Sequence, residues 1–402
     1  MRVLYLHQFF TTREGTQGTR SYEFARHLVQ AGHDVTMVTA ARRRPQRREV
    51  EGIDVREVGG ASPDYVTATG RGYAGRVAGF ARFTAGAAAK GLRGPRPDVV
   101  FATSPPLTIG LAGIAAARRW RVPFVFEVRD LWPEAPIQMG ALRSPGAQRA
   151  ARALERGTYR AAAHVVALSP GMRDGVLAGG VPPERVTLIP NASDLALFSP
   201  EVDPGDLRSR LGLEDAFVAS YFGTMGEAND LGQVVEAAAL LQERGEGSVA
   251  FVLQGDGKRR LDMEADIERR GLANVHLLPA GDKHSAARLA AASDACMTIF
   301  KDVPILATNS PNKLFDTFAA GRAAIVNTGG WQRELVESNE AGVHARAGDP
   351  GHLAEQVLRL RDDPELTARM GANARRLAET EFDRRLLAER LRLLLEAVAA
   401  SG

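Results

Sequence analysis

The stretch SPNKLFDTFAAG, residues 310–321, predicts a helix with a start signal and a stop signal at its two ends. Ser310 suits the N-cap, Pro311 the first helical position, and Gly321 the left-handed residue after the last turn. The free amides and the dipole of such an N-terminus favour an anion, particularly a phosphate whose sugar hydroxyls could reach Asp316, one turn after Asn312. Taken alone, the stretch is more typical of an ordinary capped helix in an α/β domain than of a binding site.

Two apolar runs that predict buried strands flank this helix. ACMTIF, residues 295–300, precedes it, and AAIVN, residues 323–327, follows it. The order strand, loop, helix, strand places residues 301–310 at the carboxyl edge of a parallel sheet, where ligands of such folds bind. The neighbouring sequence therefore favours a binding site over a purely structural helix.

The same region resembles the donor-site segment of retaining GT-B glycosyltransferases of glycosyltransferase family 4. It matches the branch pattern P-x-K-[IL]-F-[DE]-x-[FL]-A-[AS]-G from Pro311 to Gly321. The resemblance implies an α/β protein of GT-B fold, with two Rossmann-like doubly wound domains that face each other across a cleft. It implies an acceptor-side domain at 1–192, a nucleotide-sugar-binding domain at 193–382, and a helix at 383–402 that crosses back to the first domain.

Composition sets wider limits on the class of protein. A chain of 402 residues is long enough for two cores, and its 45% hydrophobic and 25% charged content is typical of a soluble globular protein. A single cysteine, Cys296, fits a reducing cytoplasm, and the first residues predict a strand rather than a signal peptide. No apolar run approaches the ~18 residues of a membrane span.

Basic residues gather in the first half of the chain, in RRRPQRR at 42–48 and in a looser series between Arg143 and Arg160. Such a surface can attract anionic lipid headgroups or a pyrophosphate-linked lipid acceptor, or it can simply be solvated. Binding of nucleic acid is disfavoured, because aromatic residues make up only 6% of the chain and do not interleave with the arginines. We therefore expect a cytoplasmic protein that can associate with the inner face of the membrane.

The first half begins with a strand at 3–7, a glycine-punctuated loop, a helix at 19–31 and a strand at 34–39. The loop sequence G-T-Q-G differs from the dinucleotide fingerprint G-x-G-x-x-G, and no acidic residue ends the second strand, which disfavours a dehydrogenase. Its glycines allow the backbone to approach a phosphate or a sugar closely. The predicted ligand-binding residues of this loop are Gly15, Thr16, Gln17 and Gly18.

A strand at 123–128 runs into the charged sequence EVRDLWPE, residues 127–134. Charged groups at a strand end are costly unless they are solvated or used, so a surface salt-bridge cluster is the alternative to a functional site. Related transferases carry R-D-L-W-P-E here, lining the cleft near the reacting sugar. The predicted catalytic residues are Glu127, Arg129 and Asp130, with Asp130 positioning the sugar or the acceptor.

The second half supplies the predicted donor site. A strand at 218–222 leads into the glycine-containing loop 223–230. In this loop the family carries an arginine and a lysine that neutralise the donor pyrophosphate, whereas this chain has Thr224 and Asn229. We expect Lys258 and Lys313 to take over the role of the missing arginine and lysine. The family holds the base by backbone contacts where the strand at 275–278 ends. The donor-binding residues of this half are predicted to be Gly223, Thr224, Met225, Lys258, Leu278, Pro279, Thr308, Asn309, Ser310, Asn312, Lys313, Leu314 and Asp316.

The resemblance implies transfer of a sugar, an N-acetylated hexosamine in that branch, from a UDP-sugar to a hydroxyl acceptor with retention. The UDP-sugar is a co-substrate, and neither a cofactor nor an obligatory metal is implied. The family's E-x7-E pair aligns with Thr308 and Asp316, so Asn309 or Asp302 compensates for the first carboxylate or the sugar is recognised differently. A lipid-linked acceptor in polysaccharide or glycolipid assembly, a small natural product, and epimerisation of a UDP-sugar remain open alternatives.

Overall fold

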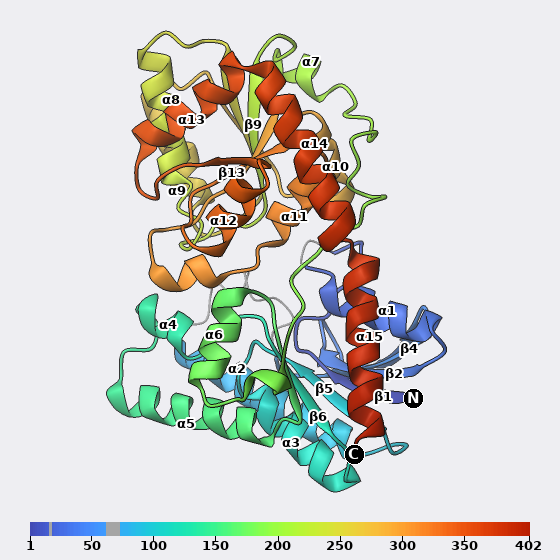
Figure 1. The fold of residues 1–402 in the computed structure, drawn as a ribbon. Coiled ribbons are helices and arrows are strands. Elements are labelled where there is room, and N and C mark those ends of the chain that lie inside the picture. The colour runs from blue at the N-terminus through green and yellow to red at the C-terminus, as the bar shows by residue number, and fades with distance from the viewer. Residues whose placement is uncertain (16–17, 62–72) are drawn as a thin grey trace.

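The computed structural model describes residues 1–15, 18–61 and 73–402, which form two α/β domains, drawn one above the other in Figure 1. The N-terminal domain is built on an eight-stranded sheet of order β3-β4-β2-β1-β5-β6-β7-β8, in which only β3 is antiparallel to its neighbour. Its strands are β1 (Arg2–Leu6), β2 (Asp34–Ala40), β3 (Arg47–Val50), β4 (Ile53–Val58), β5 (Val99–Thr103), β6 (Phe124–Val128), β7 (His164–Ala167) and β8 (Val186–Leu188).

Helices cover both faces of this sheet, so its central strands are buried on both sides and largely apolar rather than alternating. All five residues of β5 and of β6 are buried. The helices of this domain are α1 (Arg20–Gln30), α2 (Tyr73–Gly91), α3 (Ile109–Trp120), α4 (Glu134–Gln138), α5 (Pro145–Ala161), α6 (Pro170–Ala178) and the 3-10 turn η1 (Pro183–Arg185).

The C-terminal domain has a six-stranded parallel sheet of order β11-β10-β9-β12-β13-β14. Its strands are β9 (Phe217–Phe222), β10 (Val249–Gln254), β11 (Val275–Leu278), β12 (Ala295–Thr298), β13 (Ala323–Val326) and β14 (Gly342–His344). Its helices are α7 (Leu207–Leu211), α8 (Gly232–Glu243), α9 (Arg260–Arg270), α10 (Lys283–Ala291), the 3-10 turn η2 (Pro304–Thr308), α11 (Asn312–Ala319), α12 (Trp331–Ser338), α13 (Pro350–Asp362) and α14 (Pro364–Glu381).

In both sheets the first strand of the domain lies between the second and a later one: β1 between β2 and β5, and β9 between β10 and β12. The strand order reverses at these positions, which is where open α/β sheets bind ligands at their carboxyl edges. The two doubly wound domains confirm the predicted fold class, and they place α11 beside the reversal point in the second sheet.

The last helix, α15 (Arg384–Ala400), leaves the C-terminal domain and packs against α1, so both chain ends lie in the N-terminal domain (Figure 1). Leu387, Leu391 and Leu395 recur on one face and are buried in that domain's apolar cluster. The chain passes between the two domains near Ser193 and again near Arg384, and these two crossings lie side by side. The Ser193 N–H donates to the Phe382 carbonyl at 3.1 Å, and the Arg384 N–H donates to the Ser193 carbonyl at 3.0 Å. The two domains are thus tied at one edge.

The predicted cap of α11 is wrong by one residue. The N-cap is Pro311 rather than Ser310, because the Ser310 hydroxyl accepts a hydrogen bond from the Asn191 N–H at 3.0 Å and so holds the interdomain linker instead. The stop signal is confirmed, since Gly321 has a φ of +65°, a conformation that glycine adopts without strain.

Candidate active site

The N-terminus of α11 faces the N-terminal domain across a close contact at Gly18. A Cβ atom at Gly18 would lie 3.1 Å from Asn312 Nδ2 and 3.6 Å from a guanidinium nitrogen of Arg129. Glycine therefore allows the first loop, the end of β6 and the first turn of α11 to meet. This brings together three predicted site segments that lie far apart in the sequence; Thr16 and Gln17, also predicted here, lie outside the described residues.

Lys313 supplies a cation next to the free amides of α11. Its Nζ donates to the Tyr221 hydroxyl at 2.9 Å and lies over the rings of Tyr221 and Phe300, at 4.5 and 5.3 Å from their centroids. Burial, and then the charge of Lys283, lower the pKa of Lys313 to about 7. No carboxylate of the described residues forms an ion pair with it, so an incoming anion would relieve the cost of this buried charge.

Asp316 is held in place by two partners that the sequence did not predict. Its Oδ1 accepts from the Ser193 hydroxyl at 2.8 Å, and its Oδ2 pairs with the Lys283 ammonium at 2.6 Å. The Asp316 side chain is only 2% exposed, so this is a buried ion pair. Lys283 follows the N-cap Asp282 of α10, a position that carries no local signal of an ionic partner 33 residues away.

Arg129 extends from the end of β6 toward the same region, and Asp130 follows it in the chain. Arg129 Nη1 lies 3.3 Å from His7 Nε2, and burial together with the Arg129 charge holds the pKa of His7 well below its usual range. A neutral His7 can therefore accept from the guanidinium. Burial raises the pKa of Asp130 to about 6 although the Arg129 charge opposes the shift. His7 was missed because a lone histidine at a strand end is more often structural.

Glu127, the third predicted catalytic residue, has a different place. Its carboxylate is fully buried and accepts from Arg20 Nη2 at 2.8 Å and from the Thr103 hydroxyl at 3.0 Å. Arg20 also donates to the Ile189 carbonyl at 2.8 Å, which ties the pair to the linker. The Glu127 carboxylate is thus engaged within the fold by Arg20 and Thr103, and its catalytic role stays a prediction.

Two predicted donor contacts, Met225 and Leu314, have side chains that belong to the core. Met225 is buried, its N–H donates to the Asp256 carbonyl at 2.8 Å, and its carbonyl accepts from the Arg259 N–H at 3.0 Å. Leu314 is buried and its N–H donates to the Pro311 carbonyl at 3.1 Å. The free amides of α11 are thus those of Asn312 and Lys313.

The remaining predicted residues line the edges of this region. Gly15 packs against Thr11, and Gly223, at φ +137°, would bring a Cβ within 3.2 Å of the Lys313 side chain. Thr308 donates to the Ile305 carbonyl at 2.7 Å and Asn309 accepts through its carbonyl from Gln332 at 3.3 Å. Three further predicted residues are the exposed Lys258 and Pro279 and the half-buried Thr224, whose carbonyl accepts from the Tyr221 hydroxyl.

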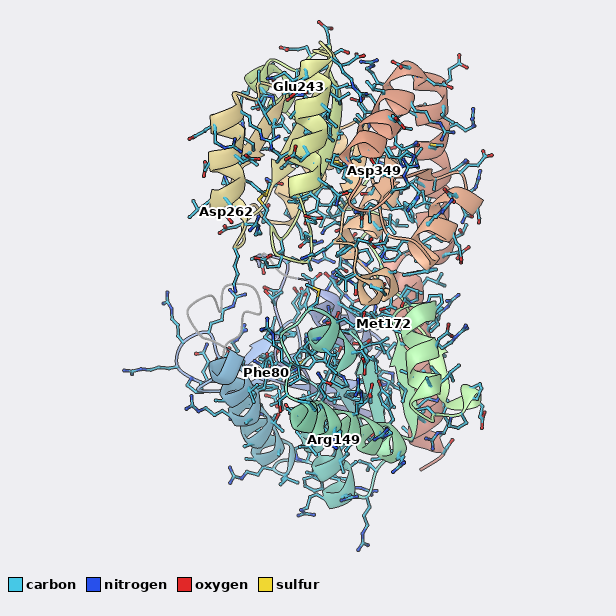
Figure 2. All side chains as sticks on the ribbon, turned by 90° about the vertical axis from the view of Figure 1, so that its left-hand side faces the viewer. Phe80, Arg149, Met172, Glu243, Asp262 and Asp349 are labelled. Atoms are coloured by element: carbon cyan, nitrogen blue, oxygen red, sulfur yellow. The ribbon has the colours of Figure 1, made fainter. Side chains whose placement is uncertain are left out.

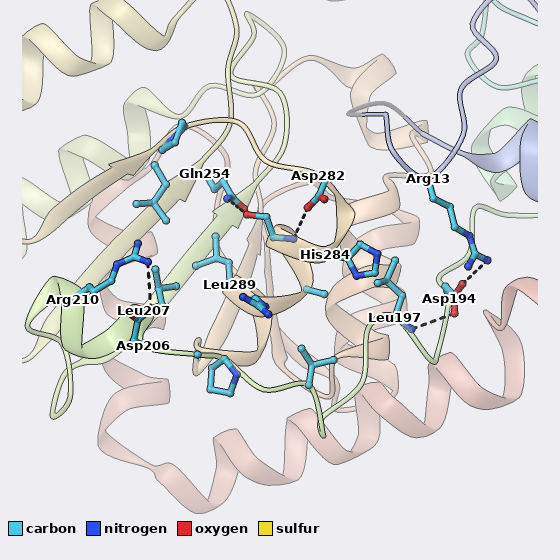
Figure 3. A pocket seen from close by; sticks show the side chains of 18 of the residues that line it. Arg13, Asp194, Leu197, Asp206, Leu207, Arg210, Gln254, Asp282, His284 and Leu289 are labelled. Atoms are coloured by element: carbon cyan, nitrogen blue, oxygen red, sulfur yellow. Dashed lines mark hydrogen bonds and ion pairs between the residues drawn. The ribbon is translucent and has the colours of Figure 1, made fainter.

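An open cavity of about 860 Å³ lies beside this region, between α10, the strand ends of β10 and β11 and the linker (Figure 3). The predicted base-binding residues Leu278 and Pro279 line it. Among the residues that the structure describes, no cluster of three or more metal-ligating side chains occurs. The helices of that part of the chain include none long and apolar enough to cross a membrane.

Two protein families match the two domains. The Glycosyl transferase 4-like domain matches residues 15–192, and Glycosyl transferases group 1 matches residues 206–377. Among solved structures, Anabaena HepE in complex with UDP-glucose superposes with a TM-score of 0.74 at 19% identity, over 99% of this chain and 100% of that one. Sucrose-phosphate synthase from Thermosynechococcus elongatus superposes with a TM-score of 0.79 at 18% identity, over 100% of both chains.

Curated relatives match over shorter segments. An alpha-D-kanosaminyltransferase from Streptomyces kanamyceticus is 28% identical over 57% of this chain and 58% of its own length. A UDP-Gal:alpha-D-GlcNAc-diphosphoundecaprenol alpha-1,3-galactosyltransferase from Escherichia coli is 27% identical over 48% of this chain and 50% of its own. The matched segments span about half to three fifths of these two relatives. The chain thus contains a Glycosyl transferase 4-like domain followed by a Glycosyl transferases group 1 domain, and its two doubly wound sheets share the fold of these solved structures.

Proposed function

We propose that the protein transfers a sugar from a UDP-sugar to a hydroxyl acceptor, with retention at the anomeric carbon. The observation that carries this proposal is the positive N-terminus of α11, where the Lys313 ammonium accompanies the amides of Asn312 and Lys313 and where the close contact at Gly18 brings in the Arg129 guanidinium. A diphosphate leaving group needs such neutralisation, and these cations supply it without an obligatory metal.

In the proposed reaction the bond between the anomeric carbon and the β-phosphate oxygen breaks, and UDP leaves with the bonding electrons. The acceptor oxygen forms the new bond on the same face, and its proton passes to the departing phosphate oxygen. Lys313 and Arg129 stabilise the negative charge that develops on that phosphate. Asp130, at the end of β6, accepts from a hydroxyl of the sugar or of the acceptor and orients it for the step.

An N-acetylated hexosamine is our proposed sugar, on the resemblance of residues 311–321 to that branch of the family. We propose a lipid-linked acceptor in polysaccharide or glycolipid assembly, at the cytoplasmic face of the membrane. The support is the exposed basic surface of α5, which carries Arg156, Arg160 and Arg149; Figure 2 labels Arg149 on this helix. The name of the E. coli relative specifies a diphosphoundecaprenol acceptor, whereas the Streptomyces relative keeps a small natural product as the alternative.

A thermal-shift panel with EDTA in the buffer tests the donor assignment. UDP, GDP, dTDP, ADP and several UDP-sugars are added to the wild-type protein, and the expected result is a rise in Tm with UDP and one UDP-sugar. A ligand present at 100 times its Kd stabilises the folded state by about 2.7 kcal/mol. If no nucleotide raises the Tm, the transferase proposal fails; a hit is followed by transfer assays with lipid-linked and soluble acceptors.

Asp130 is expected to give the rate a pH dependence. With a pKa raised to about 6, its carboxylate is charged above that pH and neutral below it. If the charged form orients the substrate, kcat/KM of the wild type falls as the pH drops through 6. Asp130→Asn should be slow at every pH and should not show this fall. A pH profile that is the same in wild type and Asp130→Asn would remove Asp130 from the site.

A further inference from the structure

Gln254, the last residue of β10, has a buried amide that is only half satisfied. The residue is 7% exposed, and its Nε2 donates to the Ser285 hydroxyl on α10 at 2.6 Å. Its Oε1 accepts no hydrogen bond from any of the described residues. Such an acceptor is unfavourable inside a protein unless a bound molecule or water meets it.

The same side chain lines the cavity of about 860 Å³ (Figure 3). Its lining residues Asp282 and His284 are the chain neighbours of Lys283, which pairs with Asp316, so α10 links the cavity to α11. A nucleoside whose diphosphate lies at the α11 N-terminus and whose ribose lies near Asp316 would therefore direct its base toward Gln254. The volume is ample for a pyrimidine ring.

The backbone carbonyl at the end of β11, which could otherwise accept a hydrogen bond from a base, already accepts hydrogen bonds from the protein. The Leu278 carbonyl accepts from the Gly255 N–H at 3.4 Å and from Arg260 Nη1 at 2.8 Å. The amide of Gln254 and the hydroxyl of Ser285 thus form a polar pair that lines the cavity. In this pair Gln254 Oε1 can still accept a hydrogen bond, and the Ser285 hydroxyl can still donate one.

We propose that Gln254 is the side chain that selects the nucleobase of the donor, an inference that rests on the proposed function. Its Oε1 accepts from N3–H of uracil, and the Ser285 hydroxyl donates to a neighbouring uracil carbonyl. Cytosine presents an acceptor at N3, so its lone pair would face the amide oxygen. The pair therefore favours UDP over CDP, since a site built for a donor rejects an analogue that lacks it.

The test compares Kd values of UDP, CDP and inorganic pyrophosphate, by calorimetry, for wild type and Gln254→Met, a substitution of similar length without the amide. We expect UDP binding to weaken about 10- to 100-fold, the UDP:CDP preference to fall toward one, and pyrophosphate binding to stay unchanged. Gln254→Glu, which keeps only acceptor oxygens, retains the UDP preference. Gln242→Met, at an exposed position on α8, is the matched control and keeps the wild-type values.

The outcomes separate this inference from the proposed function. If wild type binds UDP and Gln254→Met keeps both its Kd and its UDP:CDP preference, Gln254 does not read the base. Equal loss of UDP and pyrophosphate binding in Gln254→Met likewise contradicts base reading, because it indicates a damaged fold. If wild type binds no nucleoside diphosphate, the proposed function itself fails.

Discussion

Replacing Lys313 by methionine is expected to lower kcat/KM for the sugar donor by roughly 100- to 1,000-fold, the range seen when one preorganised donor to a developing anion is removed. The ammonium lies 2.9 Å from the Tyr221 hydroxyl, beside the free amides of α11, where a departing diphosphate would gather charge. Methionine keeps much of the side-chain volume over Tyr221 and Phe300. Steady-state kinetics with the donor identified by the thermal-shift panel measure the effect.

Two other lysine variants make this result decisive. Lys90→Met, near the end of α2 in the other domain, is the control and keeps wild-type kinetics. Lys258→Met tests the second lysine that the sequence offered for the same role; because Lys258 is exposed, we expect a loss below tenfold. A large loss in Lys258→Met with a small one in Lys313→Met would reverse the assignment.

Lys313 also links stability to pH, and the sign follows from its lowered pKa. The folded-state pKa is about 7, whereas the ordinary value is 10.5, so between these pH values the unfolded chain binds more protons than the folded one. This group's contribution to the free energy of unfolding therefore rises with pH through that window. Urea unfolding at pH 7 and pH 9 should show a larger increase for wild type than for Lys313→Met.

The second large effect is expected at the buried ion pair of Asp316 and Lys283. Asp316→Asn leaves the Lys283 ammonium without its carboxylate, and breaking a buried pair from one side costs about 3–5 kcal/mol. Converting both partners together, in Asp316→Leu with Lys283→Met, should recover most of that loss. Urea unfolding of Asp316→Leu, of Lys283→Met and of the double variant gives the coupling energy. Purely additive losses would mean that the pair is not coupled in solution.

The double variant also tests whether Asp316 contacts the donor ribose. Each oxygen of its carboxylate already holds one hydrogen bond, and each keeps a lone pair for a ribose hydroxyl. Wild type should bind UDP more tightly than 2′,3′-dideoxy-UDP, and the folded double variant should bind both equally weakly. A preference for UDP that survives in the double variant would assign the ribose contact to other residues.

The sequence by itself determined the parts of this protein that depend on neighbouring residues. Apolar runs set the buried strands, and Gly321 ended α11 because the left-handed residue there costs glycine nothing. The resemblance of residues 311–321 also supplied the proposal of a donor site at α11, with Asn312 and Lys313 in it. These features follow from local backbone preference and burial pattern, which a linear sequence carries directly.

Only the tertiary structure decided which side chains are free to act. Glu127 forms an ion pair with Arg20, 107 residues away, and the Ser310 hydroxyl accepts a hydrogen bond from Asn191, 119 residues away. Asp316 forms an ion pair with Lys283. Arg129 lies near the first turn of α11 because the linker and α15 hold one domain against the other. Hydrogen bonds and ion pairs between distant segments depend on how those segments pack, and no local pattern in the chain records that distance.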